Sequence, residues 1–520
     1  MLRTPVLFFT CLDDVFVKGT VLSAIVIHNI YYKPCTCLYE EHVDSMTRSR
    51  NILTFKLQRI KIGARRLQNT KFYALLIALV VLAGTFFLSP AISSLINSTT
   101  IRSSGQISIP AIIATSGYWQ DIQNAVDATA AYEIANVYIP EGTFNFVSVG
   151  ESWTGAKVAI PAGVNILGAP TQRTSGLPYD GVGQNPNGQV VDWKTVLVIP
   201  WDAAGGREGY RTWFFRVNGN GDPDKSTRIS DIKFVGYREI DETCESWHGA
   251  IEIRNTVDWR VDHCWFQHCT GGSVYVTSPS GGKLRGVVDH CKLINTYGYV
   301  EWWYEECSAC YGIHLKQSGT QEWEDDITKV LGHYNDNTVF IEDCYFSRWR
   351  HCVCSLDNGH WVFRHNTIEY DSIVGSLDSH GTYNYVGSRA AEIYNNLIID
   401  PVMNKHPDNW NSTTPANGGD GTAVNWRGGG GVFFNNYVRN YRFGIIMTDE
   451  GTVQKCYPHD IWIWDNAWVN IGYRPVSVTY AGNYQITEDV DYFLRAPNQE
   501  QDGFEYTPYP YPHPLTILQS

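Results

Sequence analysis

The segments "SRAAEIYNNLIID" (388–400) and "GGGGVFFNNYVRN" (428–440) share one pattern. Each places apolar residues before an Asn-Asn pair and another apolar residue two positions after it. This pattern recurs along the chain and predicts a solenoid, in which each coil buries the apolar edge of its neighbour. We call the position of the second asparagine the pivot of each coil. The equivalent positions along the chain are Cys264, Cys291, Cys344, Asn366, Asn396, Asn436 and Asn466.

Three columns around the pivots have constant chemistry. Three residues before the pivot the side chain is apolar (Val261, Val288, Ile341, Phe363, Ile393, Phe433, Ile463), and two residues after it the same holds (Phe266, Leu293, Phe346, Ile368, Ile398, Val438, Trp468). The residue directly before the pivot is polar (His263, His290, Asp343, His365, Asn395, Asn435, Asp465). These columns predict strand alternation interrupted by a corner at the pivot. Asparagine suits the corner because it tolerates the left-handed conformation, and stacked amides can form a hydrogen-bonded ladder.

A third strand precedes most of these corners. The segments are 249–256, 272–279, 311–318, 351–358, 421–428 and 443–450. Three short strands per coil predict an all-β, right-handed parallel β-helix over residues 105–495, with insertions at about 295–311, 318–337 and 400–421. A helix from about Trp119 to Ala131 is expected to cap the first coil, because an end cap covers exposed strand edges.

The N-terminal part carries an apolar run. Residues Phe72 to Leu88 have no charge and follow several basic residues, which predicts either a transmembrane anchor or a cleaved signal peptide at 72–92. An anchor is favoured, and it gives a single-pass membrane protein with an extracytoplasmic C-terminal domain. The remaining expected segments are a cytoplasmic or disordered region (1–71), of which 1–45 is interpreted as a start-site artefact or disorder, a linker (93–104) and a Pro/Tyr-rich tail (496–520).

Charge and cysteine content limit the function. A net charge of −13 argues against a nucleic-acid partner, since phosphate binding needs clustered Lys and Arg. Cysteines beyond the apolar run permit disulfides, and Cys264 and Cys291 would stack on adjacent coils. Reduced thiols packed in a core fit the same positions. The repeated Asp-His-Cys triplets at His263 and His290 are interpreted as a polar ladder at the turn and not as a metal site.

The sequence resembles the pectate-lyase-like superfamily of right-handed β-helices over about 105–515. The resemblance rests on "DIQNAVDAT…VYIPEGTF" near the start, and on "RVDHCWF" (260–266), "EIYNN" (392–396), "GVFFNN" (431–436) and "YTPYPYPHPL" (506–515). It implies a substrate groove along the outer face of the first strand of each coil. This superfamily includes lyases, hydrolases, epimerases and non-enzymatic adhesins, so the fold leaves the function open. Arg-x-Pro and Trp-x-Asp-His signatures of pectate lyases are not found, and "LDSHGTY" (377–383) is only loosely similar to the Asp-x-His segment of alginate epimerases.

Strand alternation assigns the residues of that outer face. The predicted catalytic residues are His314, Lys316, Asp378, His380 and Arg389, and the predicted substrate-binding residues are Glu252, Arg254, Tyr275, Trp302, Trp303, Tyr304, Asp357 and Arg427. Aromatic rings stack on sugars and cations pair with uronate carboxylates. Removal of the proton next to a uronate carboxylate, by His380, His314 or Lys316, would allow lyase or epimerase chemistry on an acidic polysaccharide or glycoconjugate.

Two alternatives stay open. Carboxylates of the acidic insertion (Glu322, Glu324, Asp325, Asp326) could hold Ca²⁺, which takes six to eight oxygens. Alternatively, the charges of Glu252, Arg254 and Lys316 form a solvated strand face. The protein would then be a non-catalytic surface adhesin or cell-envelope scaffold.

Overall fold

The computed structural model describes residues 109–170, 172–174, 189–200, 212–236, 248–269, 271–278, 281–295, 311–317, 326–369, 375–381, 387–400, 421–450, 457–480 and 484–517. The apolar run at 72–92, Trp302, Trp303, Tyr304 and the Cys307–Cys310 pair lie outside this part of the chain. Within it, no helix is long and apolar enough to cross a bilayer.

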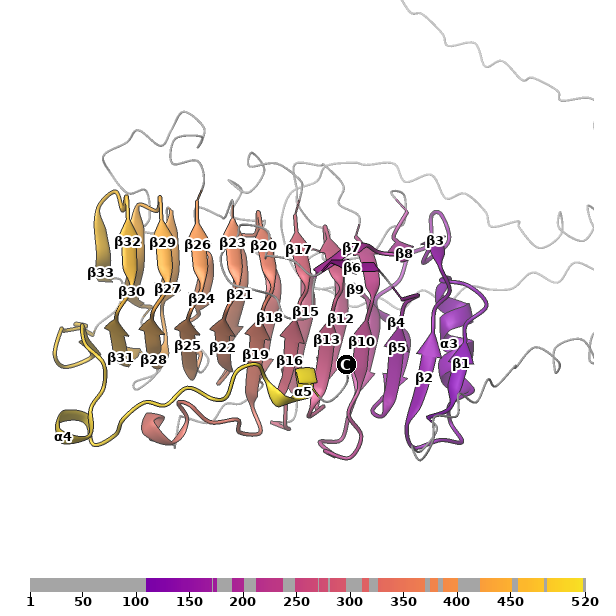
Figure 1. Cartoon of the computed structure of the whole chain (residues 1–520), viewed down its shortest axis with the longest axis horizontal. Coiled ribbons are helices and arrows are strands. Elements are labelled where there is room, and N and C mark those ends of the chain that lie inside the picture. The colour runs from indigo at the N-terminus through magenta and orange to yellow at the C-terminus, as the bar shows by residue number, and fades with distance from the viewer. Residues whose placement is uncertain are drawn as a thin grey trace, which may run out of the picture. The chain divides into compact units, whose positions relative to one another are not determined.

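Three parallel sheets run side by side along the described chain, and most coils contribute one strand to each sheet (Figure 1). Sheet 1 contains β4 (Gly155–Pro161), β9 (Thr212–Asn218), β12 (His248–Arg254), β15 (Gly271–Ser278), β18 (Tyr311–Gln317), β21 (His351–Leu356), β24 (Leu377–Ser379), β27 (Thr422–Trp426), β30 (Phe443–Asp449) and β33 (Arg474–Tyr480). This is a parallel β-helix, and it fits the right-handed form that parallel crossover connections nearly always take.

Sheet 2 has twelve strands and sheet 3 has ten. Sheet 2 contains β1 (Ala111–Ile113), β2 (Ala135–Tyr138), β5 (Val164–Leu167), β10 (Arg228–Ser230), β13 (Trp259–Asp262), β16 (Gly286–Asp289), β19 (Thr338–Glu342), β22 (His360–Arg364), β25 (Ala390–Tyr394), β28 (Gly429–Phe434), β31 (Pro458–Trp464) and β34 (Tyr492–Phe493). Sheet 3 contains β3 (Gly142–Asn145), β8 (Thr195–Val198), β11 (Ile232–Val235), β14 (Trp265–Gln267), β17 (Lys292–Ile294), β20 (Tyr345–Ser347), β23 (Thr367–Glu369), β26 (Leu397–Ile399), β29 (Tyr437–Arg439) and β32 (Ala467–Val469). A small antiparallel pair joins β6 (Gln172–Thr174) to β7 (Gln189–Asp192).

The helices are short. Helix α3 (Trp119–Asp127) packs against β2 and β4 and buries Ile122, Ala125 and Val126. It ends earlier than the predicted Ala131, and its function as an end cap stays a prediction. The other helices among the described residues are the 3₁₀ turn η2 (Ile327–Lys329), α4 (Gln499–Asp502) and α5 (Pro514–Ile517).

The two apolar columns share one interior. Every residue three before a pivot belongs to a single core cluster, and the residues two after it belong to the same cluster, with Trp468 packed at its margin. The inward-facing side chains predicted from strand alternation are therefore confirmed in all seven coils. The six strands that were predicted upstream of the corners, between residues 249 and 450, all lie in sheet 1. The sequence misses β24, because its three residues are too short to show alternation.

Two neighbouring residues form each corner: one adopts the left-handed conformation, and in the later coils the other provides the side-chain hydrogen bonds. The left-handed conformation belongs to the residue before the pivot, where φ lies between 50° and 58° in all seven coils. The prediction that the pivot asparagine adopts it is therefore wrong. The pivot instead forms the predicted ladder, in which the side-chain oxygens of Asn396, Asn436 and Asn466 each accept from the backbone N–H of the preceding pivot at 2.9–3.1 Å.

Thiols replace the amides in the earlier coils. Cys264, Cys291 and Cys344 occupy pivot positions, and all three are buried and free. The Sγ atom of Cys344 accepts from the backbone N–H of Cys291 at 3.4 Å, so a sulfur fills the acceptor position of the ladder. Burial raises the pKa of all three thiols. Cys264 and Cys291 form no disulfide and pack in the apolar core. Cys354 differs, because it lies outside this core and its thiol donates to the carboxylate of Asp378 at 3.5 Å.

Residues 498–517, here called the C-terminal strap, lie across the outer face of sheet 2 (Figure 1, yellow). The guanidinium of Arg364 donates to the carbonyls of Tyr509 (2.6 Å) and Pro510 (2.9 Å), and the backbone N–H of His513 donates to Glu342 at 2.8 Å. Tyr334, Phe340, Tyr509 and His513 pack their rings together at the same place. The strap thereby seals polar side chains that would otherwise face solvent.

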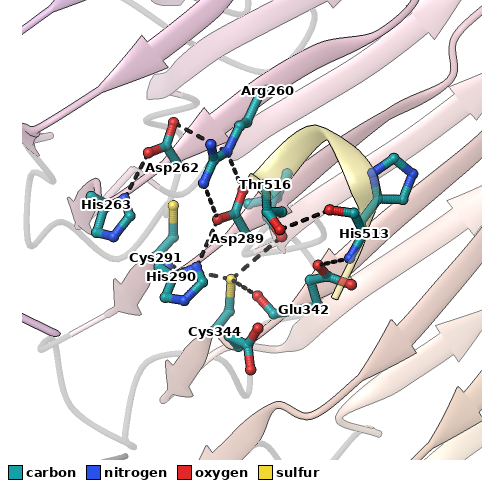
Figure 2. A network of polar contacts seen from close by, with 12 residues as sticks. Arg260, Asp262, His263, Asp289, His290, Cys291, Glu342, Cys344, His513 and Thr516 are labelled. Atoms are coloured by element: carbon teal, nitrogen blue, oxygen red, sulfur yellow. Dashed lines mark hydrogen bonds and ion pairs between the residues drawn. The ribbon is translucent and has the colours of Figure 1, made fainter. Parts of the chain in front are cut away.

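Charged pairs lie beneath the strap (Figure 2). The guanidinium of Arg260 donates twice to Asp289 at 2.8 Å, and the rings of His263 and His290 stack at 4.9 Å while each bonds the carboxylate of the aspartate before it. These stacked rings and their bonds to Asp262 and Asp289 form a polar ladder at the turn, as predicted.

Candidate functional site

The outer face of sheet 1 gathers most of the predicted site residues in two rows. Strand register places Glu252, Tyr275, His314 and Asp378 at the same outward position on β12, β15, β18 and β24. Their neighbours Ile251, Val274, Ile313 and Leu377 point into the core. Since adjacent strands lie about 4.8 Å apart, His314 and Asp378 are separated by about 10 Å, with β21 between them.

The second row lies two residues further along each strand. Arg254 aligns with Thr277, which aligns with Lys316, which aligns with Leu356. His380 follows β24 directly, and its backbone N–H donates to Ser355 of β21. The structure thus brings His314, Lys316, Asp378 and His380 onto one flank.

One end of this face is a carboxylate held between two arginines. Glu252 is fully buried and accepts from Arg216 at 2.5 Å and from Arg254 at 2.7 Å. The side chain of Arg254 is 35% exposed, so it keeps a solvent-facing edge. Sequence reasoning missed Arg216, although its place in the alternating strand "WFFRV" could have identified it.

Aromatic rings connect the two ends of the face. Tyr275 stacks on Trp213 with ring centroids 5.6 Å apart, and its ring lies 5.0 Å from that of His314. Tyr311 contacts both His314 (4.8 Å) and His351 (5.6 Å). Burial raises the pKa of Tyr311, which therefore stays protonated. The rings form a continuous row of packed, largely buried side chains from β9 to β21.

The other end holds a guanidinium between two carboxylates. Arg427 donates to Asp378 at 2.8 and 2.5 Å and to Glu450 at 2.5 Å. His380 lies 3.6 Å from the Glu450 carboxylate, and 26% of its side chain is exposed. Sequence reasoning also missed Glu450, because this residue reaches Arg427 and His380 from a neighbouring coil.

The surroundings of Glu450, Asp378 and His380 shift their pKa values in different directions. Burial raises the pKa of Glu450, whereas Asp378, although buried, is charged at all ordinary pH values because Arg427 and two histidines lower its pKa. Burial and the nearby Arg427 lower the pKa of His380 to about 4, so its imidazole is neutral near pH 7. Glu450 and the partly exposed His380 are thus neighbours whose pKa values shift in opposite directions.

Two cations at the edge of the face, Lys316 and Arg254, remain partly exposed to solvent. Lys316 is 42% exposed in its side chain, and its Nζ lies 3.5 Å from the carboxylate of Asp357. Burial raises the pKa of Asp357 despite this contact. Lys316 and Arg254 are thus the two half-exposed cations of the second row.

Arg389 lies elsewhere. It precedes β25 of sheet 2 and lines a hollow together with Asp326 and Trp462, away from the outer face of sheet 1. Both Arg389 and Asp326 were expected beside His314 from their place in the sequence. They lie on another side of the coil because the chain turns to sheet 2 before it reaches them. The described part of the acidic insertion packs through Ile327, Val330 and Leu331 on sheet 2.

Solved structures that are similar to this chain share little sequence with it. No family model and no curated protein sequence matches the chain. It is similar to the tailspike protein of E. coli bacteriophage HK620 in complex with pentasaccharide, with 13% identity and a TM-score of 0.44 over 72% of this chain and 57% of that chain. It is also similar to an alginate lyase from Paenibacillus sp. strain FPU-7, with 11% identity and a TM-score of 0.38 over 71% of this chain and 98% of that chain.

The chain spans little more than half of the tailspike's length. At these identities the likeness concerns the fold alone. The three parallel sheets themselves show a parallel β-helix, as the sequence predicted.

Proposed function

We propose that the outer face of sheet 1 binds an acidic polysaccharide and removes the proton next to a uronate carboxylate. The observation that carries this proposal is the neutral, partly exposed imidazole of His380 beside Glu450 and Arg427, on the same flank as Lys316 and Arg254. A base must be unprotonated to accept a proton, and cations must remain accessible to bind a polyanion.

Each group has a distinct task in this proposal. Lys316 and Arg254 bind the uronate carboxylates, and Arg427 stabilises negative charge that develops on the substrate. His380 accepts the proton from the carbon next to the carboxylate. In β-elimination, that electron pair forms a carbon–carbon double bond, the glycosidic carbon–oxygen bond breaks, and the proton that His380 has accepted passes to the leaving oxygen. In epimerisation, a proton returns to the opposite side and no bond of the backbone breaks.

A non-catalytic adhesin or cell-envelope scaffold is the second candidate. The observation that favours it is that Glu252 and Asp378 are fully buried and already paired with arginines of the same face. Under this proposal the ion pairs only hold neighbouring coils together.

Activity on a panel of uronate polymers separates the two candidates. The full chain is incubated with polymannuronate, polyguluronate and polygalacturonate, with and without Ca²⁺, and ultraviolet absorbance follows the formation of unsaturated ends. Proton exchange at the carbon next to the carboxylate, read by NMR in D₂O, detects epimerisation. We expect His380→Gln to lower either activity by about 100-fold or more while binding is kept.

Matched variants locate the binding cations. Lys316→Met is expected to weaken uronate binding, whereas Lys283→Met, an exposed lysine elsewhere, should leave it unchanged. Binding without turnover in wild type would favour the adhesin. If no uronate polymer binds at all, the proposal for this face fails.

Membrane attachment through residues 72–92 is a separate proposal, supported by the apolar run and the basic residues before it. Fractionation of cells that express the full chain should place it in the membrane, and deletion of 72–92 should release it. A full chain that remains in the soluble fraction would contradict this.

A further inference from the structure

The hollow lined by Arg389, Asp326 and Trp462 lies on the sheet 2 side of the molecule. It has a volume of about 660 Å³ and lies between η2, β31, β34 and the turn that contains α4. This volume is in the range of pockets that hold small molecules. Its lining combines aromatic rings (Tyr457, Trp462, Phe493) with groups of both charges (Arg389, Asp326, Asp460).

The aromatic floor of the hollow is fixed by its surroundings. Trp462 is 3% exposed, stacks on Phe493 at 5.5 Å and meets Phe504 edge-on at 5.0 Å. Its indole N–H donates to Asp502 at 3.3 Å, and Arg495 holds the same carboxylate at 2.6 and 2.9 Å. The floor is therefore rigid, and it loses little side-chain entropy when a ligand binds.

Polar groups are fixed around the rim. The carboxylate of Asp460 bonds the imidazole of His459 at 2.7 Å, and that of Asp326 accepts from the backbone N–H and the hydroxyl of Thr328 at 3.0 and 2.8 Å. Tyr457, which is partly exposed, stacks on Tyr484 at 3.7 Å. These contacts leave lone pairs on both carboxylates for further hydrogen bonds.

We propose that this hollow binds a neutral oligosaccharide. Aromatic rings provide apolar contact for sugar faces, while carboxylates and a guanidinium match the donors and acceptors of adjacent hydroxyls. A polyuronate is disfavoured by Asp326 and Asp460, and a strongly basic peptide is disfavoured by Arg389. The hollow thus recognises a different class of glycan from the one proposed for sheet 1, and neither proposal depends on the other.

Isothermal titration calorimetry on the full chain tests this assignment. The probes are cellohexaose, mannohexaose and N-acetylated chitohexaose as neutral sugars, hexamannuronate as an anion and hexalysine as a cation. At least one neutral hexasaccharide should bind wild type, and Tyr457→Ala should weaken that binding by about tenfold or more. Asp460→Asn should also weaken it; asparagine tolerates the positive φ of 56° at this position, so the fold is preserved.

Tyr473→Ala is the matched control, because Tyr473 is 62% exposed and does not line the hollow. It should bind the neutral probes as wild type does. Three results would overturn the assignment: no neutral hexasaccharide binds wild type, both hollow variants bind it unchanged, or Tyr457→Ala impairs the binding of hexamannuronate or hexalysine instead. Loss of uronate binding in Lys316→Met tests the sheet 1 proposal separately.

Discussion

The outer faces of sheets 1 and 2 follow the same alternation but differ in what covers them. On sheet 2, the strap buries Arg364 and Glu342 completely and supplies hydrogen bonds from its own backbone. On sheet 1, Arg254, Lys316 and His380 keep part of their side chains in solvent. Outward charges in a β-helix are therefore of two kinds. Those under the strap are removed from solvent, and Arg254, Lys316 and His380 on sheet 1 keep part of their side chains exposed.

The largest expected effect comes from breaking a pair beneath the strap. Arg364→Met leaves Glu342 buried without its partner and removes two hydrogen bonds to the strap. Unfolding in urea should show a loss of about 3–5 kcal/mol. On sheet 1, Arg254→Met should cost about 1 kcal/mol, because Glu252 keeps Arg216. Equal losses would mean that the two faces do not differ in the way described.

The next largest effect is expected for the pivot Asn436, compared with its left-handed neighbour Asn435. Asn436→Ala removes donors to the Ile393 and Phe434 carbonyls and an acceptor for the Asn396 backbone, so we expect a loss of about 3 kcal/mol. Asn435→Gly keeps the left-handed conformation and should cost less than about 1 kcal/mol. Both free energies of unfolding come from urea titration. A larger loss of unfolding free energy in Asn435→Gly than in Asn436→Ala would contradict the view that the pivot asparagine contributes more stability than its left-handed neighbour.

A pH dependence distinguishes the strap from an exposed surface. Burial lowers the pKa of His513 in the strap to about 3, so between about pH 3 and 6.5 the unfolded chain binds a proton that the folded chain does not. Stability from this group is therefore lost as the pH falls below 6.5. From pH 7 to 4.5, wild type should lose about 2 kcal/mol more than His513→Gln.

His333→Gln, at an exposed histidine, serves as the control. Parallel stability curves for wild type and His513→Gln over that pH range would contradict the burial of His513.

The smallest effect is expected for an exposed ion pair. Lys283 lies 2.9 Å from Asp336, and about half of each side chain is in solvent. Lys283→Ala should change the free energy of unfolding by less than about 0.5 kcal/mol. A loss above about 1 kcal/mol would show that exposure alone does not decide which charges stabilise this fold.

Local periodicity explains why so much of the fold could be predicted. A side chain on a strand points to one face or the other, so Val261, Ile393 and Ile463 reveal the interior without any knowledge of distant contacts. The same rule placed Glu252, Tyr275 and His314 on one outward row. It failed for Arg389 and β24, where the segment is too short, or lies too close to a turn, for alternation to be read.

By itself, the sequence determined the three-stranded coil, the inward columns and the asparagine ladder, because each depends on spacing within one coil. Only the tertiary structure decided which outward charges are sealed by the strap, that Glu450 meets His380, and that Arg389 and Asp326 share a hollow on sheet 2. These contacts join residues from different coils or from the distant C-terminus. Spacing along the chain does not encode them, because they depend on how the insertions and the strap fold back over the sheets.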